Sequence, residues 1–553
     1  MKFFEVWGHF LMIVLSLWSC SEPSIVNLPS IDTKDSIKST YNESPIGLRE
    51  GEGIMFNISA DGLVLYPDWG GDIEKKSKED IESSILKYLI FYSNTQITTI
   101  LINFNFQRSC YPSKIMEPYW LVENPEKDIT DWPKLHWQIH KKGIDLCGLY
   151  INTCKEVGIS PWLSIRMNDH HYFSDTSKIN HLWRDHPEYR LSNGGLFNYG
   201  KKDVRNYFKA IIEEALQRYD VDGIELDWMR TFTVFKKGEE AKGLSDLNIF
   251  MQEIRNIVNR IASIKGHPIK IAVRVPSSPE ISLSFGLDAI NWANREYVDA
   301  IIPTNWYHPT NLDIPIEKWR KNIQNTKCKV IAGADGAYCI ADNPYLKRMG
   351  NSIESMRGFA VSAYSRGADA IYLFNNGGEY FGKRVINKDG STYVISDRAD
   401  VFHEIGRYST STNKPRTHIY TYTYPSLKPI TNDGYLLDNG ESKSFLIHTG
   451  LKPTKGNFIV RIGIDKLPGF ETTNLDVQVN SKTGIQIEDM YRNTSLPYIN
   501  TKPYDFVFNV SETSARVMQF NIELDNINDG YNTISVTNRG GKPQKIIWLE
   551  VYI

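Results

Sequence analysis

The stretch Val221–Trp228, with the sequence VDGIELDW, has the pattern of a short β-strand that carries two acidic residues near its end. Side chains alternate between the two faces of a strand. Ile224 and Leu226 therefore share one face. Glu225 and Asp227 share the other. If this strand belongs to a closed barrel, its apolar face packs against helices, so both acids are expected to point into the barrel.

Seven further apolar runs of strand length flank this stretch, and segments with helical periodicity separate them. Eight alternating strand and helix units predict an α/β fold of the (β/α)8 barrel type. A doubly wound open sheet is the alternative, but the glycine fingerprint of dinucleotide-binding sheets is missing from the sequence. The eight predicted strands are 53–59, 97–106, 160–168, 221–228, 269–275, 298–306, 329–335 and 369–376.

Two connections between these elements are long, 107–140 and 169–200. Both leave the carboxyl end of a predicted strand, where barrels build their active sites. The predicted helices include 79–93, 203–219, 248–263, 315–325 and 351–367.

After residues 407–418 the helical patterns give way to alternating strands, which predict an all-β module, a β-sandwich. Its expected strands include 457–464, 504–510, 517–524, 531–538 and 545–553. We expect a signal peptide at 1–20, a flexible tether at 21–52, the barrel at 53–407 and the sandwich at 408–553.

The N-terminus predicts a secreted, lipid-anchored protein. Lys2 precedes the apolar run Phe10–Leu17, which is too short to span a bilayer but suits a signal peptide. The LWSC sequence that ends at Cys20 resembles a bacterial lipobox, so Cys20 is the expected lipidation site. An ordinary signal peptide cut nearby is the alternative. The lipid anchor predicts a place at the outer membrane, on the cell surface or the periplasmic face.

Composition narrows the expected partners. The net charge of −2 leaves no basic excess to neutralise phosphate, so nucleic acid is not an expected partner. Aromatic residues make up 12% of the chain, which is common in sugar-binding clefts and also in large β-rich cores. The five cysteines after Cys20 are odd in number, so they cannot all pair, and no CxxC motif or His/Cys cluster indicates a metal site. Cys147 and Cys154 have the spacing of a buried helix face. No metal or other cofactor is expected.

The stretch Trp162–Phe173, WLSIRMNDHHYF, adds polar groups to the predicted barrel mouth. Arg166 falls on the inner face, where it could neutralise an acid of the next strand or bind a substrate carboxylate. Asp169, His170 and His171 follow at the strand end. The two histidines are candidates for general acid/base catalysis, and Asp169 could orient them.

Polar or ionisable groups occur at six of the eight predicted strand ends, beside aromatic residues, as expected of a pocket for a hydroxyl-rich ligand. The candidate catalytic residues are Asp227, Glu225, Asp169, His171 and Asp335. The candidate substrate-binding residues are Arg166, Asn168, His170, Trp228, Arg230, Arg274, Asn305, Trp306, Tyr307, Asn375, Asn376 and Glu379.

The sequences RMNDHHYF (166–173) and HPEYRLSNGGLFNYGKKDVRNYFKAIIEEALQRYDVDGIELDWMR (186–230) resemble the glycoside-hydrolase-like barrel proteins frequent among Bacteroidetes lipoproteins, the family 10-like hypothetical glycosyl hydrolases. The resemblance covers roughly residues 50–410. It implies a (β/α)8 fold and activity on carbohydrate. The residues that carry it are Arg166, Asn168, Asp169, His171, Tyr199, Val204, Arg205, Asp222, Gly223, Glu225, Asp227 and Arg230.

These patterns predict a glycoside hydrolase that acts on a complex glycan or on an oligosaccharide derived from a polysaccharide. Asp227 is expected to be one catalytic carboxylate, with Glu225, Asp335 or the Asp169/His171 group as its partner. A non-catalytic glycan-binding surface lipoprotein is the alternative. A further alternative is a sialidase-like exo-glycosidase that uses Arg166, Asp169 and His171.

Overall fold

The structure is a computed structural model of the 553-residue chain. It describes residues 52–172, 175–191, 195–305, 310–340, 348–374, 383–386, 392–395, 398–423, 434–492, 506–507 and 514–553. Backbone contacts divide the chain into residues 1–46 and 47–553, and the fold below belongs to the second unit. The predicted signal peptide, Cys20 and nearly all of the predicted tether lie outside the described residues.

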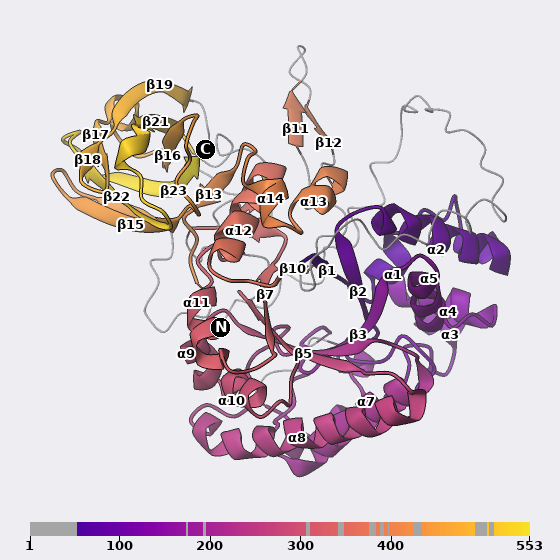
Figure 1. Ribbon diagram of the computed structural model, residues 1–553. Coiled ribbons are helices and arrows are strands. Elements are labelled where there is room, and N and C mark those ends of the chain that lie inside the picture. Colours follow the sequence, from indigo (N-terminus) through magenta and orange to yellow (C-terminus); the bar gives the residue numbers. More distant parts are fainter. Residues whose placement is uncertain are drawn as a thin grey trace. The chain divides into compact units, whose positions relative to one another are not determined.

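Eight parallel strands close into a barrel, which confirms the predicted (β/α)8 fold (Figure 1). Neighbours in the barrel follow the chain order, and the last strand pairs with the first. Every predicted strand is present. The strands are β1 (Ile54–Ile58), β2 (Ile97–Asn103), β3 (Ser160–Arg166), β4 (Gly223–Asp227), β5 (Lys270–Pro276), β6 (Ala300–Thr304), β7 (Lys329–Ala334) and β10 (Ala370–Leu373).

Helices cover the outside of the barrel (Figure 1). The predicted ones correspond to α2 (Lys78–Ser93), α7 (Lys202–Arg218), α8 (Glu240–Lys265), α11 (Ile316–Ile323) and α12 (Ile353–Ser365). A capping box between Ser77 and Asp80 fixes the start of α2, and Gly266 ends α8 with a left-handed φ of 77°. In the part of the chain that the structure describes, no helix is both long and apolar enough to cross a membrane.

The outward face of β4 follows the alternation of the sequence. Ile224 and Leu226 are fully buried in the main apolar core between strands and helices. Gly223 lies on the inner face, where a Cβ atom would come within 2.4 Å of the Trp162 ring. The glycine of VDGIELDW is therefore required by Trp162, which belongs to an apolar cluster inside the barrel.

Two antiparallel sheets form the C-terminal sandwich. One has the order β13 (Thr417–Ile419), β23 (Gln544–Tyr552), β16 (Phe458–Ile464), β21 (Arg516–Ile522) and β19 (Ile485–Arg492), with β14 (Tyr435–Leu437) also pairing β23. The other has the order β15 (Ser442–His448), β22 (Tyr531–Asn538), β17 (Leu475–Val479) and β18 (Lys482–Thr483). Residues such as Phe445 and Phe520 from opposite sheets share one apolar core, which confirms the predicted sandwich.

One predicted sandwich strand was misplaced. Within the described residues, the segment 504–510 shows β20 (Phe506–Val507), which pairs with β9 (Arg348–Gly350) in a small sheet with β8 (Ala337–Tyr338). Its alternating pattern predicted a strand correctly but could not identify the pairing partner. The sandwich strands β15, β17 and β19 were missing from the sequence prediction, although β17 (LDVQV) alternates strictly between buried apolar and partly exposed polar residues.

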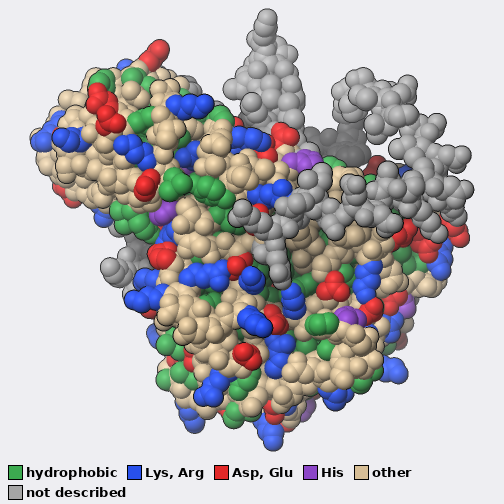
Figure 2. Space-filling view, in the orientation of Figure 1, with side chains coloured by type: hydrophobic (Ala, Val, Ile, Leu, Met, Phe, Trp, Pro, Cys, Tyr) green, Lys and Arg blue, Asp and Glu red, His purple; other side chains and the backbone are tan. Residues whose placement is uncertain are grey.

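Barrel and sandwich make direct contacts within residues 47–553. Helix α12 packs against β13, and a Cβ atom on Gly358 would come within 2.0 Å of the Thr417 carbonyl oxygen. The Tyr531 hydroxyl donates a hydrogen bond of 2.6 Å to Asp313 Oδ1. On the face in view in Figure 2, acidic and basic side chains are intermingled, as the near-zero net charge suggests.

Candidate functional site

Glu225 lies inside the barrel, as the strand alternation predicted. Asn57 of β1 donates a hydrogen bond of 2.8 Å to Glu225 Oε2 and one of 2.9 Å to Ser164 Oγ. Burial and the nearby Asp227 charge raise the pKa of Glu225 to about 7, although Arg274 opposes this shift. The Glu225 carboxyl is therefore able to hold a proton near neutral pH.

Asp227 occupies a different electrostatic environment, two residues further along the strand. The guanidinium of Arg274 approaches both Asp227 carboxylate oxygens at 3.4 Å, and the Met229 backbone N–H donates to Asp227 Oδ1 at 2.9 Å. The second terminal nitrogen of Arg274 lies 3.8 Å from Asp335 Oδ2, at the end of β7. Arg274 therefore holds two of the predicted catalytic carboxylates on one guanidinium.

Strand register explains the contrast between the two acids. Asp227 pairs with Arg166 on β3 and with Arg274 on β5, so a cation stands on each side of it. Glu225 pairs with Ser164 and Ala272 at the same two strands, so no cation flanks it directly. Strand register thus places Asp227 between two cations, whereas the deeper Glu225, whose pKa is raised, has none directly beside it.

A second cluster joins three residues of the β3 end. Asp169 accepts hydrogen bonds from Arg166 Nη1 at 3.0 Å and from the His171 backbone N–H at 2.8 Å, and His171 Nδ1 lies 2.7 Å from Asp169 Oδ1. Although burial acts against ionisation, His171, Arg166 and Arg230 hold the pKa of Asp169 well below its usual value. The His171 side chain is 26% exposed, so this dyad has one buried and one accessible member.

The predicted sialidase-like group is thus brought together, but its arginine is already engaged. Arg166 is buried, forms an ion pair with Asp169 and lies 3.5 Å from the centroid of the Phe106 ring. Burial and the neighbouring Arg230 lower the pKa of Arg166 to about 10, against the opposite effect of Asp169. This geometry suits an arginine that orients Asp169 better than one that binds a substrate carboxylate.

His170 lies beside Thr231 and the His171 ring. Its Nδ1 lies 2.8 Å from Thr231 Oγ1, and its ring is stacked near that of His171 at 5.8 Å. Burial and the charges of His171 and Arg230 lower the pKa of His170 to about 4. Because the imidazole stays neutral at pH 7, His170 is a weaker general acid than the sequence suggested. Arg230 itself lies over the Phe374 ring at 5.0 Å.

Two predicted substrate-binding residues have structural roles instead. Trp228 is fully buried, with its ring 5.0 Å from Tyr199 and 6.5 Å from Trp292, among the packed helices. The alternation that turns Asp227 inward turns Trp228 outward, so it cannot line the barrel mouth. The Asn168 side chain donates to the carbonyl oxygens of residues 197 and 233 and accepts from the residue 197 N–H, so it ties two loops together.

Of the other predicted substrate-binding residues, some lie within the described residues and some outside them. Asn305 is buried, and its side-chain amide donates a hydrogen bond of 2.9 Å to the Tyr422 carbonyl. Five predicted substrate-binding residues lie outside the described residues, namely Trp306, Tyr307, Asn375, Asn376 and Glu379.

Sequence reasoning missed several residues of this region. Asn57 and Tyr372, from β1 and β10, surround Glu225, and the pKa of Tyr372 is raised by burial and by Glu225. Phe106 stacks on His171 at 4.7 Å. Strand alternation could have identified Asn57 and Tyr372. Asn57 shares a face of β1 with Met55, and Tyr372 lies on the same face as Phe374, and both Met55 and Phe374 belong to the apolar cluster inside the barrel.

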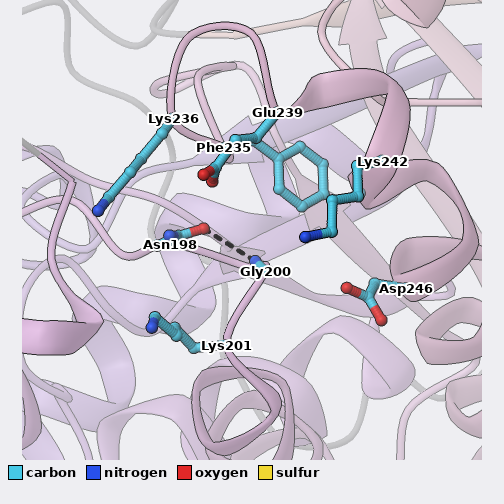
Figure 3. A pocket seen from close by; sticks show the side chains of 9 residues that line it. Asn198, Gly200, Lys201, Phe235, Lys236, Glu239, Lys242 and Asp246 are labelled. Atoms are coloured by element: carbon cyan, nitrogen blue, oxygen red, sulfur yellow. Dashed lines mark hydrogen bonds between the residues drawn. The ribbon is translucent and has the colours of Figure 1, made fainter.

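A separate pocket of about 200 Å³ lies between the starts of α7 and α8 (Figure 3). Lys201, Lys242 and Glu239 are among its lining residues, and Asn198 Oδ1 accepts a hydrogen bond from the Gly200 N–H. None of the sequence-predicted site residues lines this pocket. Among the described residues, no cluster of three His, Cys, Asp or Glu side chains could hold a metal ion.

No family model and no curated protein matches the chain. Solved structures match at low identity and with low TM-scores. A cycloisomaltooligosaccharide glucanotransferase from Paenibacillus sp. is 12% identical with a TM-score of 0.33, and the match covers 90% of this chain and only 57% of that one. An alpha-L-fucosidase from Paenibacillus thiaminolyticus is 12% identical with a TM-score of 0.32, and the match covers 88% of this chain and 97% of that one. A family GH18 chitinase from Chromobacterium violaceum is 10% identical with a TM-score of 0.34 (90% and 91% covered). These similarities concern the fold alone.

Proposed function

We propose that this chain is a glycoside hydrolase that acts on a complex glycan or on an oligosaccharide derived from a polysaccharide. The observation that carries the proposal is the arrangement of Asp227 and Asp335 on the guanidinium of Arg274, at the carboxyl ends of barrel strands. Glycosidases of the common kind need two carboxyl groups on either side of the bond that is cleaved. A barrel that only had to be stable would gain little from two buried acids there.

Arg274 sets an upper limit on the separation of these two carboxylates. Asp227 and Asp335 lie 3.4 and 3.8 Å from different terminal nitrogens of Arg274. Two such nitrogens are roughly 2.3 Å apart, so the nearest carboxyl oxygens are at most about 9.5 Å from each other. That limit includes the distances of roughly 5 to 9.5 Å that retaining and inverting enzymes use.

We assign the reacting role to Asp227, with Asp335 as its partner. The guanidinium of Arg274 lies 3.4 Å from both carboxyl oxygens of Asp227 and fixes their orientation, as a nucleophile or a general base requires. Glu225 is a positioning residue beneath it. While the Glu225 carboxyl is protonated, it places no negative charge next to Asp227. As the pH rises through about 7, Glu225 loses its proton and this charge appears.

The Asp169–His171 pair supplies a proton carrier at the mouth of the barrel. Asp169 engages His171 Nδ1, which fixes the ring orientation and leaves Nε2 for the substrate side. The partly exposed His171 ring is the accessible member of the pair, so a leaving-group oxygen could reach it without displacing the buried ion pairs.

The test is sugar release by the wild type and by Asp227→Asn, measured as new reducing ends on a panel of hexasaccharides and soluble polysaccharides. We expect activity from the wild type and a loss of at least about 1000-fold in the variant, because it lacks a carboxylate that reacts. Asp185→Asn, at an exposed aspartate, is the matched control. If the wild type releases no sugar and Asp227→Asn binds glycan as well as the wild type does, the chain is a glycan-binding protein instead.

We also propose the domain division and location that the sequence suggests, with a barrel at 53–407, a sandwich at 408–553 and a lipid on Cys20 that anchors the chain at the outer membrane. The support is the lipobox-like LWSC sequence and the polar stretch behind it. Metabolic labelling with an alkyne fatty acid tests the anchor. We expect label on the wild type and none on Cys20→Ser, which should move to the soluble fraction.

A further inference from the structure

The two long loops of the barrel bring aromatic rings to His171. Phe106, just after β2, stacks on the His171 ring at 4.7 Å with 13° between the planes. Trp132, in the first turn of α4 (Asp131–Lys141), meets Phe106 edge-on at 4.8 Å. Tyr172 follows His171 directly, and its ring is 6.5 Å away. Buried Tyr119 contacts both Trp132 and Tyr172, at 5.3 and 6.0 Å.

The rings in this group differ in accessibility. Phe106 and Tyr119 are buried, whereas Trp132 and Tyr172 are partly exposed. Within the described residues, the indole N–H of Trp132 and the hydroxyl of Tyr172 have no hydrogen-bond partner, although buried or half-buried aromatic donors usually find one. Trp132 therefore offers an aromatic ring together with an unused N–H, and Tyr172 offers an unused hydroxyl on a ring that has Lys178 Nζ 5.1 Å from its centroid.

The backbone at these two rings is held in an unusual conformation. Asp131, which precedes Trp132, has a φ of 60°, and Tyr172 has a φ of 62°. Residues other than glycine rarely adopt this left-handed region, because Cβ crowds the backbone. Two strained residues beside the same aromatic group indicate that the positions of Trp132 and Tyr172 are maintained despite a local cost, as at ligand-binding sites.

We propose that Trp132 and Tyr172 form an aromatic subsite for a pyranose ring of the glycan, next to the bond that is cleaved. The proposal rests on the function proposed above and deepens it. A pyranose presents a face of C–H groups that packs on an aromatic ring, and hydroxyls at its edge that accept from an indole N–H or a phenol. The subsite lies beside His171, so the substrate is a chain of at least two pyranose units.

Trp120, in the same connection between β2 and β3, provides a matched control. Trp120 is also partly exposed, but it stacks on His140 at 4.6 Å. Trp120→Ala therefore removes a similar side chain that stacks on a residue outside the proposed subsite. Trp132→Phe keeps a ring and removes only the N–H.

The experiment measures binding by titration calorimetry in the Asp227→Asn background, with maltohexaose, cellohexaose, xylohexaose, mannohexaose and chitohexaose as probes. For the hexasaccharide that binds, we expect Trp132→Ala to weaken affinity about tenfold, Trp132→Phe about two- to threefold, and Trp120→Ala not at all. Circular dichroism and the thermal midpoint show whether each variant is folded. If Trp132→Ala fails to fold, Trp132→Phe together with Tyr172→Phe carries the test, and both are expected to weaken binding.

The outcomes separate this subsite from the proposed enzyme activity. Equal affinity of Trp132→Ala and Trp120→Ala overturns the subsite, even if the wild type releases sugar. Loss of affinity in Trp132→Ala, with no sugar released by the wild type, supports the subsite and overturns the hydrolase. If none of the five probes binds, the subsite as proposed is wrong. In active enzyme, Trp132→Ala should raise KM about tenfold while kcat changes less.

Discussion

Replacing Glu225 with glutamine should stabilise the protein, and more so as the pH rises. The buried carboxyl has a pKa of about 7 instead of 4.5, mainly because burial disfavours its charge. Below pH 4.5 both the folded and the unfolded chain hold the proton, so the residue has no effect on pH-dependent stability. Between pH 4.5 and 7 the unfolded chain releases the proton and the folded chain retains it, so stability falls. Above pH 7 the full cost remains.

The magnitude follows from the two pKa values. At roughly 1.4 kcal/mol per pH unit, the cost of Glu225 is about 1 kcal/mol at pH 5 and about 3 kcal/mol at pH 8. Glutamine has no charge to bury and can still accept the hydrogen bond from Asn57. Glu225→Gln should therefore raise the free energy of unfolding by those amounts.

Urea denaturation at pH 5 and at pH 8, followed by near-UV circular dichroism, tests this reasoning. The difference between Glu225→Gln and the wild type should grow by about 2 kcal/mol from pH 5 to pH 8. Glu156→Gln, on the exposed face of α5 (Leu146–Glu156), should show no such change. An equal effect at both pH values, or a loss of stability at pH 8, would falsify the assignment of a protonated Glu225.

Three further substitutions test the supports of the site. Arg274→Met should destabilise the barrel by about 3–5 kcal/mol in urea, because it leaves the buried Asp227 charge unpaired, and Asp227→Asn in the same chain should restore part of that loss. Asn168→Ala removes three hydrogen bonds that tie two loops together, so we expect a loss of about 3 kcal/mol and faster limited proteolysis at the barrel mouth. Gly358→Ala should cost about 1–3 kcal/mol, because the new methyl group would meet the Thr417 carbonyl, and a thermal midpoint equal to that of the wild type would contradict this packing.

The sequence predicted the barrel well because its eight strands are apolar runs separated by helices with clear periodicity. Alternation along β4 was also sufficient to turn Glu225 and Asp227 inward. The same rule, applied to Trp228, predicts an outward side chain, but the abundance of aromatic residues in sugar sites favoured the opposite interpretation. That error came from weighing residue type above strand parity.

The partners of the acids could not be read from the sequence, because they depend on register between strands that are far apart in the chain. Asn57 is 168 residues from Glu225, and the hydrogen bond that joins them requires the closure of the barrel. The aromatic group around His171 was hidden for a similar reason. Trp132 lies in the first turn of α4 (Asp131–Lys141), within the long connection between β2 and β3, and only the folded chain brings it to Phe106.

Strand register also determines the neighbours of Glu225 and Asp227. The position of each acid along β4 does not explain the difference between them. Asp227 lies closer to the carboxyl end of β4 than Glu225 does, but both side chains are fully buried. What distinguishes it is its neighbours, since Arg166 and Arg274 flank it while Ser164 and Ala272 flank Glu225. A shift of β5 by two residues would place Arg274 beside Glu225 instead of Asp227. The different neighbours of the two carboxyls are therefore a property of strand pairing, which the closure of the barrel fixes.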